Sequence, residues 1–297
     1  MKQSNTERNS YDGSLYGLFT LLETFCGETG ETPAKSLHEG CGLWYSQGCS
    51  SRREASGQRE LFVFSEPETP PEIPPEPCLA RPSFQGDLFR EYQDALELPL
   101  AKELYGYSVS AHDGFVHGWM SELPIEAELI RYARRVITAA RTAPRGAGRY
   151  RAEQAALDRG DPVVRTVLEA ASKVTQEIHR LTGFLRFSPH SGGSSIAHCE
   201  PDYFALPALA FHFSRRFGET SWKIIDKRRS LCLAQTPKGE IRLFPLTGGA
   251  EEHPEDDPWE ALWRNYHRSI NNESRNNPAL QRQFMPKRYW KYLPEVD

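Results

Sequence analysis

Long apolar runs are missing from this 297-residue chain. A membrane-spanning helix needs roughly 20 consecutive apolar residues, and the mean hydropathy of −0.61 fits a chain without one. The N-terminal stretch MKQSNTERNSYDGS also lacks the apolar core of a secretion signal. We therefore expect a cytoplasmic protein that makes no membrane contact.

Closely spaced cysteine pairs are also missing. The six cysteines include no C-x-x-C pair, so thiols are expected rather than disulfides. Structural zinc sites and iron–sulfur clusters need characteristic ligand spacings, which are absent here. The cysteines therefore indicate no metal site, and the sequence indicates no cofactor. The cysteines are Cys26, Cys41, Cys49, Cys78, Cys199 and Cys232.

A strongly basic overall charge is lacking, since the formal net charge is −4. The basic side chains are nevertheless concentrated in two segments. Residues 211–230 hold six lysines and arginines against two acids, and residues 264–292 hold seven against one. Two basic segments in a mildly acidic chain fit a local anionic partner. Solvated surface charge explains the same counts, and composition does not separate the two readings.

Two regions differ in composition. Residues 1–82 form an N-terminal segment that ends in the Pro- and Glu-rich run SEPETPPEIPPEP, whose prolines exclude helix and sheet ladder. This run either tethers a small N-terminal lobe or is an insertion within one domain. Residues 83–297 form the predicted core domain.

Hydrophobic spacing predicts an α+β fold that is helix-rich, with a small antiparallel sheet or hairpin in the C-terminal half. Asp161-Pro162 is a strong helix start, because Asp accepts backbone N–H bonds and Pro fits the first turn. Residues 141–151 are expected to form a basic loop. Helices are predicted after Ser14, over 84–105 with a weak point at Pro99, over 125–141, from Pro162 to Gly183, after Asp202 and over 258–272. Strands are predicted at 184–187 and 221–226, and as a hairpin around the turn TPKG.

The first candidate site is QEIHRLTGFLRF. Glu177 and Arg180 are three residues apart and can pair on one helix face. Positive charge at His179 and Arg180 also suits the C-terminal end of a helix. In a short strand, Arg186 would share a face with Phe184, where it could hold phosphate, stack on a base or pair with a buried acid.

The second candidate is HSGGSSIAHCEPDY. Gly192 and Gly193 permit close approach of the backbone to a ligand, as in anion-binding loops, although a Walker lysine is missing. His198, Glu200 and Asp202 could bind a metal or act as acid and base. Alternatively, Asp202 caps the next helix.

Two further candidates follow in the chain. In FHFSRRF, apolar packing of Phe213 would leave His212, Arg215 and Arg216 on an outer face that suits phosphate. In WKIIDKRRS, Asp226 shares a strand face with apolar residues and needs a partner, for which an arginine of a preceding segment is the obvious source. Asp226 is therefore either a structural ion-pair member or a catalytic carboxylate.

The last candidate is the tail RNNPALQRQFMPKRYWKYLPE, which interleaves basic and aromatic residues. Such a segment suits single-stranded nucleic acid, because charges follow phosphates while rings stack on bases. Docking of the aromatics on the domain is the alternative, more so for Trp290 than for Lys287 and Arg288.

Taken in order, these motifs resemble the bacterial family of probable DNA metabolism or repair proteins. The resemblance covers nearly the whole chain, although residues 27–82 are longer and richer in Pro and Glu than the family pattern. It implies a DNA context, a radical SAM protein as partner and, in some members, fusion to a uracil-DNA-glycosylase-like domain, which does not follow here. The matching residues are Tyr11–Ser14, Glu177, His179, Arg180, Gly183, Phe184, Arg186, Phe187, Pro201, Asp202, His212, Phe213, Arg216, Trp222, Asp226, Arg229, Arg275–Pro278 and Met285–Trp290.

Three functions remain open at this stage. The first is a DNA-repair-associated protein that binds single-stranded or damaged DNA and acts with a radical SAM or glycosylase-type partner. The second is a base- or backbone-processing enzyme with His179, His212 and Asp226 as catalytic residues. The third is an assembly subunit without nucleic-acid contact. The predicted nucleic-acid-binding residues are Arg180, Arg186, Arg215, Arg216, Arg229, Lys287 and Arg288.

Overall fold

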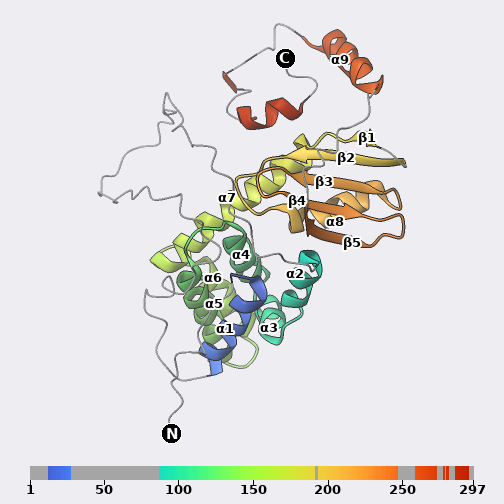
Figure 1. Ribbon diagram of the computed structural model, residues 1–297. Helices are drawn as coiled ribbons and strands as arrows, with labels where there is room; N and C mark the ends of the chain where they lie inside the picture. Colours follow the sequence, from blue (N-terminus) through green and yellow to red (C-terminus); the bar gives the residue numbers. More distant parts are fainter. Residues whose placement is uncertain are drawn as a thin grey trace.

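The fold is α+β and helix-rich, with a sheet in the C-terminal half, as predicted (Figure 1). The computed structural model describes residues 13–27, 87–190, 193–246, 258–272 and 285–293, together with 277, 279 and 280. Its first seven elements are α1 (Leu15–Gly27), α2 (Leu88–Leu96), α3 (Pro99–Tyr107), α4 (Val109–Met120), α5 (Glu126–Arg141), α6 (Gly148–Leu157) and α7 (Pro162–Phe184). Its C-terminal elements are β1 (Ser188–His190), β2 (Ser194–Cys199), α8 (Leu206–Phe217), β3 (Trp222–Asp226), β4 (Leu231–Gln235), β5 (Ile241–Pro245), α9 (Pro258–Ile270) and the 3₁₀ helix η4 (Lys287–Tyr292).

Helix α7 begins where the sequence predicts. The Asp161 side chain accepts the backbone N–H bonds of Val163, at 2.8 Å, and of Val164, at 3.4 Å. Pro162 occupies the first turn, where its missing N–H costs nothing. The apolar stripe of α7 is buried against the other N-terminal helices, among which α1 also packs. The Pro- and Glu-rich run and most of residues 1–82 lie outside the described residues.

The sheet has the strand order β1-β2-β3-β4-β5 and is mixed. β2 and β3 run parallel, whereas the other three neighbouring pairs are antiparallel. The sequence predicts a small antiparallel sheet or hairpin, and the pair of β2 and β3 differs from this prediction by being parallel. The reason is that α8 connects β2 to β3 as a crossover, and a crossover returns the chain in the same direction.

Helix α8 covers one face of the sheet, and alternate side chains of β3 point toward it. Trp222 and Ile224 of β3 pack against α8 residues that include Leu209 and Phe213, and all four are fully buried. The predicted inner face of α8 and the hairpin of β4 and β5 are thus confirmed. The polar side of α8 consequently points away from the sheet.

Several local predictions differ from the structure. Residues 185–187 are not a strand, because α7 continues to Phe184 and the N–H of Leu185 still bonds to Leu181. The segment HSGGSS, residues 190–195, is expected to be a loop, but its last two residues begin β2, which continues to Cys199. Helix α6 begins inside the predicted basic loop, and α4 was not predicted at all.

The helical core and the sheet core meet near the start of α8. The Phe204 N–H donates to the Met120 carbonyl at 3.0 Å, and its ring stands edge-on to Trp119 at 5.6 Å. Asp87 caps α2 and also accepts the N–H of Leu243 in β5, at 3.1 Å. Across the described residues, none of the helices combines the length and apolarity that crossing a bilayer requires.

Candidate functional site

A buried arginine joins the helical layer to the sheet. Arg229 lies in the turn between β3 and β4, and 6% of its side chain is exposed. The Asp226 carboxylate, which is 0% exposed, organises this turn by accepting the backbone N–H groups of Arg228, at 2.9 Å, and Arg229, at 3.1 Å. It also accepts Arg229 Nη1 at 3.0 Å.

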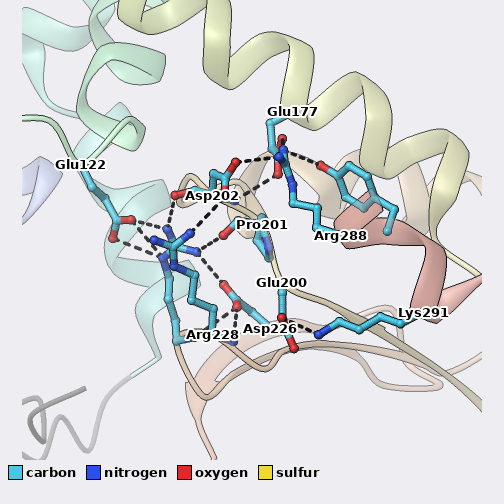
Figure 2. Close-up of polar contacts among 11 residues, drawn as sticks. Glu122, Glu177, Glu200, Pro201, Asp202, Asp226, Arg228, Arg288 and Lys291 are labelled. Carbon is cyan, nitrogen blue, oxygen red and sulfur yellow. Dashed lines mark hydrogen bonds and ion pairs between the residues drawn. The ribbon is translucent and has the colours of Figure 1, made fainter. Parts of the chain in front are cut away.

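All five N–H donors of the Arg229 guanidinium have acceptors within the chain. Nη1 donates to Asp226 and to the Pro201 carbonyl at 2.9 Å, and Nη2 donates to Glu122 and to the Asp202 carbonyl at 3.0 Å. Nε donates to Glu122 at 3.1 Å. Glu122 has a left-handed φ of 55°, and its carboxylate points into this cluster (Figure 2).

Burial affects the pKa values of both Arg229 and Asp226. Burial would lower the pKa of the Arg229 guanidinium, but hydrogen bonds and the charges of Glu122 and Asp226 outweigh it and raise that pKa. Burial raises the pKa of Asp226, and Arg229 opposes this effect. Asp226 therefore depends on Arg229 for its charge, which is the structural role weighed from the sequence. The partner is not an arginine of a preceding segment but one three residues further along the chain.

A second arginine fastens the C-terminal segment to α7. Arg288 of η4 donates through Nη2 to Glu177 at 2.6 Å, and its Nη1 lies 2.8 Å from Asp202 (Figure 2). Glu177 is buried and also accepts the backbone N–H of Asp202 at 3.1 Å. The expected pairing of Glu177 with Arg180 is thus replaced by a contact with η4. Asp202 likewise does not cap α8, whose N-cap residue is Ala205.

Glu200 anchors the end of η4. Its carboxylate accepts Lys291 Nζ at 2.7 Å and the Tyr292 hydroxyl at 2.7 Å. Partial burial would raise the pKa of Glu200, but these two hydrogen bonds and the charge of Lys291 outweigh it and lower that pKa. Glu200, Asp202, Glu177 and Asp226 therefore all have cationic partners in the structure.

The three predicted catalytic residues lie in different environments. Asp226 has no exposed surface, whereas His179 on α7 and His212 on α8 are exposed. A solvent-lined pocket that holds all three is therefore not formed. Among the described residues, no three His, Cys, Asp or Glu side chains gather as a metal site.

The outer face of α8 collects exposed basic and aromatic side chains. His212, Arg215 and Arg216 are exposed, as the spacing predicted. Phe211 is 72% exposed, and the Arg215 guanidinium lies 5.6 Å from its ring centroid. Phe211 is not among the residues predicted from the sequence, although its place four residues before Arg215 puts both on one helix face.

The other predicted contact residues lie at the end of α7 and in η4. Arg180 is half-buried in the last turns of α7, and Lys287 is exposed at the start of η4. Arg186 donates through Nη1 to the Gly183 carbonyl at 2.8 Å, which satisfies an acceptor at the helix end. Gly192, Arg275, Tyr11 and Asp12 lie outside the described residues.

Comparison with known proteins places the chain in a family. The family model "Domain of unknown function (DUF4130)" matches residues 138–295, which is more than half of the chain. The chain belongs to this family. In this DUF4130 member, the matched span includes α7, the whole sheet, α8 and η4, whereas Glu122 lies before it. No curated protein and no solved structure matched the chain.

Proposed function

We propose that this protein binds nucleic acid through the outer face of α8. The observation that carries the proposal is the exposed set of Phe211, His212, Arg215 and Arg216 on a helix whose inner face is fully buried. The helix cannot turn this set inward, since Leu209, Phe213 and their neighbours anchor it to the sheet. An aromatic ring beside two guanidinium groups suits a single strand of nucleic acid, because the ring stacks on a base while the cations neutralise phosphates.

Of the arginines that the sequence predicts to bind nucleic acid, the proposed surface includes only Arg215 and Arg216. Arg229 has all its donors occupied inside the chain, and Arg288 is engaged by Glu177 and Asp202. Binding of nucleic acid at the outer face of α8 requires neither Arg229 nor Arg288. Lys287, Arg180 and Arg186 stay as secondary candidates. The resemblance to DNA metabolism proteins supports DNA as the polymer and a radical SAM or glycosylase-type protein as the partner.

Fluorescence anisotropy with single-stranded DNA and with damaged duplex DNA tests the proposal over a range of salt concentrations. Each arginine that contacts a phosphate contributes about one unit to the slope of log affinity against log salt. Arg215→Ala/Arg216→Ala should therefore lower the slope by about two. The matched control is Arg159→Ala/Arg165→Ala, which removes two exposed charges elsewhere and should leave the slope unchanged.

Substitutions of Phe211 separate a nucleic acid from an acidic protein partner. Phe211→Tyr should keep the affinity for single strands, while Phe211→Leu should weaken it by about 1–3 kcal/mol through lost stacking. Equal binding by both variants, together with capture of a protein that survives nuclease, would favour the assembly-subunit alternative. Absence of DNA binding at low salt, with and without a partner protein, would rule the proposal out.

A further inference from the structure

The start of α6 carries a group of exposed arginines. The sequence predicts a basic loop over residues 141–151, and this stretch forms a turn followed by the beginning of α6. Residues 141–157 hold four arginines and one acid. Arg145, Arg149 and Arg151 are exposed, and within the described part of the chain their guanidinium groups make no hydrogen bond and no ion pair. The proposed surface on α8 includes none of these three.

The carboxylates close to this stretch bind other groups. Glu153, its one acid, accepts the hydroxyls of Ser108 at 2.5 Å and of Ser110 at 2.7 Å. Glu103 binds Arg141, whose Nε and Nη2 donate to it at 2.8 and 2.7 Å. These carboxylates therefore make no ion pair with the three exposed arginines, whose positive charge faces the solvent.

The backbone that carries these arginines is held in place. A backbone hydrogen bond of 2.9 Å closes a turn over residues 144–147, and Gly146 has a φ of 85°, which fits the third position of a type II turn. Arg145 occupies the second position of that turn. A Cβ on Gly148 would lie 3.2 Å from the Ala140 carbonyl oxygen, so the start of α6 packs closely on the end of α5. Little backbone freedom is therefore lost when a partner binds here.

An aromatic side chain stands among the arginines. Tyr150 lies between Arg149 and Arg151 in the chain, and 64% of it is exposed. Its hydroxyl accepts Nε2 of Gln154, one turn further along α6, at 2.6 Å, which orients the ring. An exposed ring between guanidinium groups suits a single strand of nucleic acid, because the ring stacks on a base while the cations neutralise phosphates. An acidic protein needs only the arginines.

We propose that the start of α6 is a second surface that binds single-stranded nucleic acid. Arg145, Arg149 and Arg151 contact phosphates, and Tyr150 stacks on a base. Neither kind of contact reads the base sequence. The inference goes beyond the proposed function and does not depend on it. Helix α6 packs on α3, α4 and α5, whereas α8 packs on α7 and the sheet, and the two surfaces share no residue.

The test uses the full chain that already carries Arg215→Ala/Arg216→Ala, so that the two arginines of α8 no longer contribute. Fluorescence anisotropy measures the affinity of this chain for a labelled single-stranded oligonucleotide over a range of salt concentrations. Adding Arg149→Ala/Arg151→Ala should lower the slope of log affinity against log salt by about one to two units. The matched control adds Arg159→Ala/Arg165→Ala instead, which removes two exposed charges elsewhere and should leave the slope unchanged.

Substitutions of Tyr150 in the same chain test the stacking. Tyr150→Phe should keep the affinity for the oligonucleotide, while Tyr150→Leu should weaken it by about fivefold or more. Ala favours helix at exposed positions, so thermal melting of the Arg149→Ala/Arg151→Ala variant should show no loss of stability.

Three results would overturn the proposal. The first is absence of oligonucleotide binding at low salt by the chain with altered α8. The second is a salt slope that Arg149→Ala/Arg151→Ala leaves unchanged. The third is equal oligonucleotide binding by both Tyr150 variants together with equally tight binding of polyglutamate, which would assign the surface to an acidic protein. The effect of Arg215→Ala/Arg216→Ala is measured separately, so either surface can fail while the other passes.

Discussion

Arg228 and Arg229 are neighbours in the chain with opposite environments. Arg229 is buried and makes hydrogen bonds to two carboxylates and two carbonyls, while Arg228 is half-exposed and pairs with Asp202 at 3.1 Å. A buried ion pair that loses one member leaves the other charge uncompensated, whereas an exposed pair is screened by solvent.

Arg229→Ala should therefore lower the free energy of unfolding by about 3–5 kcal/mol, because Asp226 and Glu122 lose their partner. Arg228→Ala should cost less than about 1 kcal/mol. Urea denaturation of the two variants measures the difference. Similar losses in both would contradict the central role of Arg229.

The residue pattern of β3 identifies Asp226 as a carboxylate that needs a partner, but it does not identify that partner. An acid on an apolar strand face needs a cation, which the alternation of β3 makes visible. The identity of that cation depends on the tight turn that folds Arg229 back over Asp226, with Ser230 at a φ of 52°. Turn geometry of this kind is not encoded in the residue types alone. The prediction that Asp202 caps α8 failed for a related reason. Asp202 precedes α8 in the chain, but its partners Arg228 and Arg288 are distant in sequence.

Helix α4 packs closely against its neighbours through glycine. A Cβ on Gly118 would lie 2.5 Å from Leu129 Cδ2 and 3.6 Å from Val167 Cγ1. Leu129 and Val167 are both fully buried, so neither can easily give way. Gly106 in α3 is the contrasting case, because a Cβ there meets nothing within 4 Å.

Gly118→Ala should thus destabilise the protein by about 1–3 kcal/mol through overpacking, despite the better helix propensity of Ala. Gly106→Ala should be neutral or stabilise by about 0.5–1 kcal/mol, because Ala loses less backbone entropy than Gly on folding. Thermal or urea unfolding compares the two, and a stabilised Gly118→Ala variant would show that α4 has more room than the structure gives it.

At this level, periodicity predicted α1, α5, α7, α8 and α9, each of which has an amphipathic pattern or a clear start. It failed for α4, whose buried residues include Gly114 and Gly118 as well as Phe115. Glycine contributes no apolar signal and disfavours helix on propensity, so VSAHDGFVHGWM lacks a stripe. Close packing against α5 and α7 outweighs that propensity.

Considered as a whole, the molecule holds its C-terminal 3₁₀ segment η4 against α7 and β2 by charge. Glu200 binds Lys291 and Tyr292, and Glu177 binds Arg288. The pKa of Glu200 is lowered in the folded state, so its ionised form favours folding. That contribution is complete above the usual carboxyl pKa of 4.5 and is lost as the pH falls through the lowered value.

Glu200→Gln should therefore melt at a lower temperature than the unaltered chain at pH 7, and the difference should shrink as the pH approaches 3. The stability difference should stay below about 1 kcal/mol, because the carboxylate is partly exposed. Glu240→Gln, which alters an exposed pair in the β5 hairpin, serves as the comparison. A difference that is constant from pH 7 to pH 3 would contradict the role of Glu200.

The sequence by itself determined the α+β class, the start of α7 at Asp161-Pro162, the buried face of α8 and the resulting outward position of Arg215 and Arg216. These follow from local spacing, since a helix or strand fixes which neighbours share a face. Only the tertiary structure decided that β2 and β3 are parallel and that Arg229 and Arg288 are engaged inside the chain. It also brought Lys223, Arg242 and His190 from three different strands to the lining of one pocket. The physical reason is that these relations join residues from different elements, and periodicity places residues on elements without placing the elements against one another.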